Sequence, residues 1–110
     1  MSFRNPIPVR LKYARKRANL SQKALGERIG MDESTASARM NQYERGRHTP
    51  ELKTLKLIAD ELGVPLSYFF CEDELSAELV TNLNKLSEDE KLKVLEFSIK
   101  LLANFEDGSD

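Results

Sequence analysis

Apolar residues recur at helical spacing along the chain, and turn residues divide them into short segments. A first helix is predicted over about residues 8–18, where basic residues fill the solvent side, namely Arg10, Lys12, Arg15, Lys16 and Arg17. A second is predicted over residues 22–29, because Ser21 offers an N-cap oxygen and Gly30 can close the helix. No stretch alternates apolar and polar residues as a half-buried strand does. The predicted fold class is therefore all-α.

Three more segments follow before the composition changes. A third helix is expected over about residues 32–46, with a narrow apolar stripe beneath a polar surface. Thr49 followed by Pro50 predicts the N-cap and first residue of a fourth helix, whose inward face starts with Leu52. The apolar segment 66–70 is then expected to fill the core of a five-helix bundle.

The chain is predicted to divide into residues 1–70 and a C-terminal helical segment, residues 71–110. Leucines recur about every turn over residues 75–86, and Ser87 with Glu90 fits a capping box that begins a long helix. That helix is apolar on more than one stripe. One stripe is expected to pack on the preceding helix, and another needs the cover of a second copy of the chain. The predicted dimer interface consists of Val94, Leu101 and Phe105.

Charge is distributed unevenly, although the whole chain of 110 residues has a formal net charge of only -1. Residues 1–50 carry eleven Lys and Arg against four Asp and Glu, a balance of +7. Residues 51–110 carry six against fourteen, a balance of -8. This asymmetry predicts that the first half binds a polyanion such as nucleic acid and that the second half serves another purpose.

Several classes of protein are excluded by the composition. No apolar run approaches the roughly 18 to 20 residues that cross a bilayer, and the first residues lack a signal-peptide core, so we expect a cytoplasmic protein with no membrane partner. Cys71 and His48 alone cannot supply the four protein ligands of a structural zinc site, and no metal or cofactor is expected. Neither a phosphate-binding glycine loop nor a nucleophile motif is present, so we expect no enzyme activity.

Three separated segments carry a family resemblance. Residues 20–31 (LSQKALGERIGM), 43–46 (YERG) and 62–70 (LGVPLSYFF) resemble the Cro/repressor-like helix-turn-helix (XRE) family, and the similarity covers about residues 9–70. The resemblance implies a five-helix lambda-repressor-like bundle in which the helix after the turn enters the DNA major groove. Gly26 lies where the family usually has alanine, at a close crossing of two helices.

The resemblance also implies a DNA-binding surface on the second and third helices. Its residue types suit that role, since Arg can bridge guanine O6 and N7, Asn and Gln can pair with adenine, and Ser, Thr and Ala can meet a thymine methyl. Candidates for the groove are Glu33, Ser34, Thr35, Ser37, Ala38 and Arg39, with Asn41 and Gln42 further along. Candidates for phosphate contacts are Gln22, Lys23, Arg45, Arg47 and His48.

One departure leaves the base-contact register open. Between Gly30 and the corner at residues 44–46 the chain is about four residues longer than the common family pattern, roughly one helical turn. Either the recognition helix is longer, or a longer turn precedes a normal helix whose readers are Arg39, Asn41 and Gln42. Glu44 is expected to be structural, pairing with a basic neighbour or a helix end, because a carboxylate facing DNA would be repelled.

The function expected from these observations is a sequence-specific regulator of transcription that binds double-stranded DNA. One recognition helix reads few base pairs, so we expect a homodimer on a palindromic operator that represses by occluding a promoter. The alternative is a protein-interaction module, such as a DNA-binding antitoxin that neutralises a protein partner. The acidic second half would serve that alternative.

Overall fold

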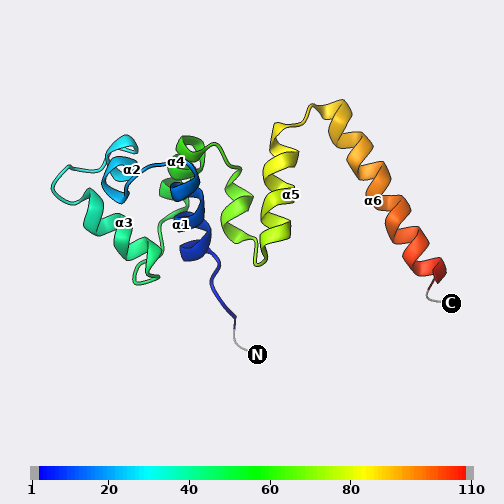
Figure 1. The fold of residues 1–110 in the computed structure, drawn as a ribbon, viewed down its shortest axis with the longest axis horizontal. Helices are drawn as coiled ribbons and strands as arrows, with labels where there is room; N and C mark the ends of the chain where they lie inside the picture. The colour runs from blue at the N-terminus through cyan, green and yellow to red at the C-terminus, as the bar shows by residue number, and fades with distance from the viewer. Residues whose placement is uncertain (1–2, 109–110) are drawn as a thin grey trace.

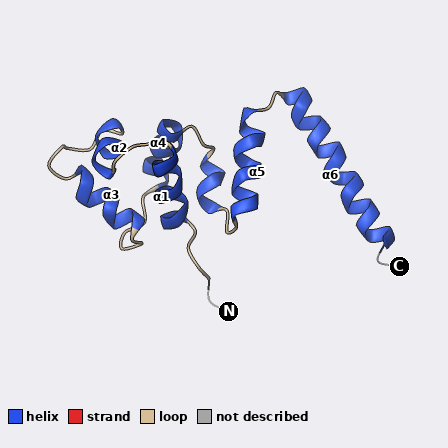
Figure 2. Ribbon diagram, viewed as in Figure 1, coloured by secondary structure: helices blue, strands red, loops and turns tan. Residues whose placement is uncertain are grey.

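The computed structural model describes residues 3–108, and its regular elements in that range are all helices (Figures 1 and 2). The predicted all-α class is confirmed. None of the described helices is both long and apolar enough to cross a membrane. In chain order the elements are α1 (Ile7–Arg17), α2 (Gln22–Arg28), α3 (Ala36–Glu44), α4 (Leu52–Leu62), the 3-10 helix η1 (Leu66–Phe70), α5 (Glu74–Lys85) and α6 (Glu88–Gly108).

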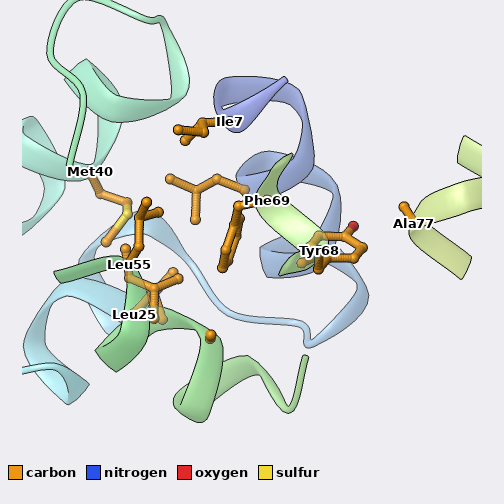
Figure 3. Packing of buried hydrophobic residues seen from close by; sticks show 11 residues of the cluster. Ile7, Leu25, Met40, Leu55, Tyr68, Phe69 and Ala77 are labelled. Atoms are coloured by element: carbon orange, nitrogen blue, oxygen red, sulfur yellow. The ribbon is translucent and has the colours of Figure 1, made fainter. Parts of the chain in front are cut away.

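The hydrophobic core lies where α1 to α4 and η1 meet, which confirms the five-helix lambda-repressor-like bundle (Figure 3). η1 inserts Phe69 into its centre, and Tyr68 packs edge-to-face on that ring at 5.5 Å between centroids. The expectation that residues 66–70 fill the core is therefore confirmed. The largest fully buried side chains are Leu11, Leu25, Met40, Ile58 and Phe69.

The start of α4 differs from the prediction. Thr49 and Pro50 precede the helix, and the N-cap residue is Glu51, whose backbone is extended. Pro50 is buried, so it contributes to packing instead of opening the first turn. Leu52, the first residue of α4, is 62% exposed, so its prediction as a core residue was wrong.

The turn between α2 and α3 is the longer element, and α3 is a helix of ordinary length. Residues 31–35 lie outside the helix, in a turn in which the Asp32 carbonyl accepts hydrogen bonds from the amides of Thr35 at 3.0 Å and Ala36 at 2.9 Å. The predicted helix start near Asp32 was therefore wrong. Of the two alternatives that the sequence left open, the longer turn before a normal helix is the one found.

Gly26 lies against the buried Ala36 at the crossing of α2 and α3. A Cβ on Gly26 would lie 2.8 Å from the Ala36 Cβ atom and 3.1 Å from the Ala36 backbone. Real Cβ atoms essentially never approach so closely. The close helix crossing expected at this glycine is confirmed, and the alanine usual in the family would not fit without a shift.

The C-terminal helices have different environments. α5 packs on η1, with Ala77 only 2% exposed, and its Glu74 and Glu78 pair with Arg10 and Arg17 of α1 at 3.7 Å and 3.8 Å. α6 instead extends away from the rest of the chain (Figure 1). Its eight large apolar side chains are between 40% and 75% exposed, so the expectation that one stripe packs on the preceding helix was wrong.

The junction between α5 and α6 explains this divergence. Only Leu86 and Ser87 connect the two helices, and Leu86 has an extended backbone. The predicted capping box is present: the Ser87 amide donates to Glu90 Oε1 at 2.8 Å, and the Glu90 amide donates to Ser87 Oγ at 3.2 Å. These hydrogen bonds lower the pKa of Glu90 from its ordinary value. α6 thus begins as an independent helix directly after the break.

Candidate nucleic-acid interface

Gln22, at the first position of α2, is held by two side chains of α3. Its Nε2 atom donates to Asn41 Oδ1 at 3.2 Å and to Glu44 Oε1 at 3.0 Å. A candidate phosphate ligand and a candidate base reader, which are far apart in the sequence, therefore touch. The Ser21 hydroxyl accepts from the Ala24 amide at 2.9 Å and fixes the same helix end, as predicted from the N-cap.

Glu44 is anchored from below by Arg15 of α1. Arg15 Nε and Nη2 donate to the two Glu44 carboxylate oxygens at 2.5 and 3.0 Å, and Arg15 Nη1 donates to the Leu20 carbonyl at 2.8 Å. The side chains of Arg15 and Glu44 are 9% and 2% exposed. The expectation that Glu44 pairs with a basic residue is confirmed. Such a bidentate pair fixes geometry as well as charge.

Arg10 and Arg15 were predicted to lie on the solvent side of α1, and both are buried. Arg15 can be buried because the buried Glu44 carboxylate receives its guanidinium group. Arg10 has a weaker partner, since its Nη1 atom lies 3.7 Å from the exposed Glu74 carboxylate, and its Nε atom is buried without a hydrogen-bond partner among the described residues. One signal in the sequence pointed to Arg15: it follows the fully buried Leu11 by four residues and so shares its helix face. The partners themselves come from other helices.

The outer face of α3 carries the exposed polar side chains. Ala38, Gln42 and Arg45 lie on the side of the helix opposite the buried Ala36 and Met40, as 100° per residue requires. Asn41, half-buried beside Gln22, borders this face. Ala38, Gln42 and Arg45 are exposed. We call Ala38, Asn41, Gln42 and Arg45 the α3 outer face.

The other candidates lie around the α3 outer face. Arg39 is exposed and turns toward α4, where it lines two shallow hollows together with Tyr43 and Thr54. Glu33 lies in the turn before the helix, and its carboxylate accepts from Lys23 Nζ at 3.3 Å. Also exposed are Ser34 and Thr35 in that turn, Ser37 on α3, and Arg47 and His48 in the loop after α3.

These features define a class of protein. A short α2 crosses α3 through a glycine contact, α2 presents its first residue beside the outer face of α3, and basic residues flank both helices. This is the arrangement of a helix-turn-helix domain, in which the second helix is offered to a DNA groove.

Comparison with known proteins agrees with that class. The HTH_3 family model, described as helix-turn-helix, matches residues 11–69, and the chain belongs to this family. The crystal structure of the transcriptional regulator BswR is similar to this chain at 46% sequence identity, with a TM-score of 0.80, and the similarity covers 89% of this chain and 97% of BswR. A search of curated proteins finds no match. The resemblance to the XRE-type helix-turn-helix family is confirmed.

Proposed function

We propose that this protein is a sequence-specific regulator of transcription that binds a palindromic operator as a homodimer and represses by occluding the promoter. The observation that carries the proposal is the α3 outer face, whose exposed amide and guanidinium groups are backed by a buried bidentate pair. The match to the helix-turn-helix family model and the similarity to the transcriptional regulator BswR support a role in the regulation of transcription. Residues 1–70 would bind DNA, and residues 71–110 would join two copies.

The geometry suggests roles for individual residues. Because α3 begins at Ala36, Gln42 and Asn41 are best placed to pair with base edges, and Ala38 to contact a thymine methyl. Arg39 would read bases at the margin next to α4. Glu33, Ser34, Thr35 and Ser37 would contact the groove near the start of α3. Gln22, Lys23, Arg45, Arg47 and His48 would contact phosphates and set the register.

Selection of bound sites from random double-stranded DNA tests the DNA-binding part. We expect enrichment of an inverted repeat by the wild-type protein and its loss in Gln42→Ala. Lys56→Ala is the matched control, since Lys56 is exposed on α4 and pairs with Asp60 four residues away. Absence of any enriched motif in the wild type would contradict sequence-specific binding, and enrichment of single half-sites alone would contradict the homodimer.

The homodimer has its own test at Val94, Leu101 and Phe105. The double variant Leu101→Glu with Phe105→Glu places two charges in the proposed interface, where burying them is costly. It should therefore be monomeric by light scattering. Lys100→Glu, on the polar side of α6, is the matched control and should remain dimeric. Operator binding should weaken far more than half-site binding in the double variant. A wild-type protein that is monomeric at micromolar concentration would refute this proposal.

A protein-binding role is the second candidate, and the exposure of α6 favours it. A different chain could cover the same apolar side chains, as the antitoxin alternative requires. Native mass spectrometry of the protein purified from its own host separates the two candidates. Homodimer masses alone favour the regulator, whereas a stoichiometric complex with a different chain favours the interaction module.

A further inference from the structure

α5 has two apolar faces, and the first domain covers only one of them. Ala77 is buried against η1 and Val80 packs beside it. A second face carries leucines separated by three or four residues, and two of these, Leu75 and Leu79, are 70% and 53% exposed. The α5 stripe consists of Leu75, Leu79, Leu83 and Leu86.

α6 has apolar positions on more than half of its circumference. All of the large apolar residues except Phe97 fall into two neighbouring stripes, each with the alternating spacing of three and four residues that is typical of helix seams, and the second stripe also includes the polar Ser98. One helix partner covers one such seam, so α6 needs two partners. The first α6 stripe consists of Leu92, Leu95, Ile99 and Leu102. The second α6 stripe consists of Val94, Ser98, Leu101 and Phe105.

Neither α6 stripe is covered within the described chain. α6 leads away from α5 at the connection formed by Leu86 and Ser87 (Figure 1). The first α6 stripe is therefore exposed, as are Leu75 and Leu79 of the α5 stripe, whereas Leu83 and Leu86 are half-buried. At roughly 100 Å² of exposed surface for each large apolar side chain, α6 offers about 800 Å² in each chain, which is the area per partner of a standard stable interface. A second copy of the same chain offers both missing partners at once.

We propose that two chains exchange α6: the first α6 stripe of one chain packs on the α5 stripe of the other, while the second α6 stripes pack on each other. This inference rests on the proposed homodimer and specifies its architecture. It assigns Leu75 and Leu79 to the interface in addition to the three residues of α6 predicted from the sequence.

The exchange has a consequence for DNA recognition. α5 is fixed to its own DNA-binding domain through the buried Ala77 and through the pairs Arg10–Glu74 and Arg17–Glu78. An α6 that packs on the partner's α5 therefore fixes one DNA-binding domain relative to the other. Binding should then require one half-site spacing, because each recognition helix must meet the major groove on the same side of the duplex.

Disulfide cross-linking between two distinguishable chains tests the exchange. Cys71 is the only cysteine of the sequence, so Cys71→Ser gives a background without thiols. One chain carries Leu79→Cys, and a second, tagged chain carries a cysteine at one position of the first α6 stripe. The chains are unfolded, mixed, refolded and oxidised. Exchange predicts a covalent heterodimer for at least one of the four α6 positions, at several-fold higher yield than for Lys93→Cys on the polar side of α6.

Each outcome decides the question. If α6 folds back on α5 of its own chain, the mixed single-cysteine chains cannot cross-link, and one chain with both cysteines closes an internal disulfide instead. A dimer that gives no α5–α6 cross-link at any of the four positions overturns the exchange but leaves the homodimer intact. A monomer overturns the proposed homodimer itself. Helix content is checked by circular dichroism, and Leu75→Cys replaces Leu79→Cys if the latter does not fold.

Discussion

The buried pair between Arg15 and Glu44 should contribute to stability and to DNA binding in separable ways. Glu44→Ala leaves the nearly inaccessible Arg15 guanidinium without its carboxylate and removes one acceptor of Gln22. Breaking a buried pair in this way costs about 3 to 5 kcal/mol, a large part of a typical domain stability of roughly 5 to 15 kcal/mol. We expect a correspondingly lower urea midpoint for Glu44→Ala at fixed protein concentration, followed by circular dichroism.

The double variant Arg15→Met with Glu44→Leu separates the two effects. Replacing both charges by apolar side chains of similar volume is often close to neutral, although the Leu20 carbonyl also loses its donor, at about 1 kcal/mol. The double variant should therefore be much more stable than Glu44→Ala. It should still bind the operator weakly, because Gln22 is no longer held by Glu44.

The control and the refuting result are both simple. Glu27→Ala removes an exposed acid of α2 in the same basic half and should change stability by less than about 0.5 kcal/mol. Fluorescence anisotropy with a selected site measures binding of all three variants. If the free energy of unfolding of Glu44→Ala lies within about 1 kcal/mol of the wild-type value, or if the double variant binds DNA as tightly as the wild type, the role assigned to this pair is wrong.

Three more predictions follow from the contacts. Gly26→Ala should destabilise the protein by about 1 to 3 kcal/mol in urea unfolding because its Cβ meets Ala36. Ala36→Gly added to it should restore only part of the loss, because the backbone of residue 36 stays 3.1 Å from the new Cβ atom. Gln42→Ala should reduce the preference for particular base pairs by about 1 to 3 kcal/mol of binding free energy. Arg47→Ala should instead weaken binding to all DNA sequences alike and lower the slope of log K against log salt by about one. Equal behaviour of the two variants in a scan of mismatched sites would contradict both roles. Burial raises the pKa of the Cys71 thiol, so the rate of its alkylation by iodoacetamide should rise at a higher pH than the rate for a free cysteine does. An alkylation rate at about pH 8 equal to that of the unfolded chain would contradict this prediction.

Local signals in the sequence predicted the elements of the fold. The Ser21 cap and the Ser87 capping box are decided by residues within one turn of each other, and both are present as expected. The same applies to η1, whose apolar run at residues 66–70 had to be buried. Periodicity of this kind specifies which elements form and which faces turn inward.

Features that depend on distant partners could not be predicted in this way. Arg15 is buried because Glu44, 29 residues further along, receives it. The start of α3 depended on whether the Asp32 carbonyl would cap a turn or begin a helix, and the sequence pattern permits both. For α6, counting apolar positions predicted more apolar surface than one helix can cover, but it did not show that the preceding helix leaves all of this surface exposed.

The placement of Glu44 also explains how a recognition helix can contain an acid and still be offered to DNA. The buried Arg15 neutralises the charge of Glu44, so the pair adds no net charge to the protein surface. The +7 balance of residues 1–50 is the same with or without these two residues. Of the remaining acids, Glu33 already pairs with Lys23 at the edge of the interface. Arg45 and Arg47, at the end of α3 and after it, are exposed, and we predict that they contribute to the salt dependence of binding.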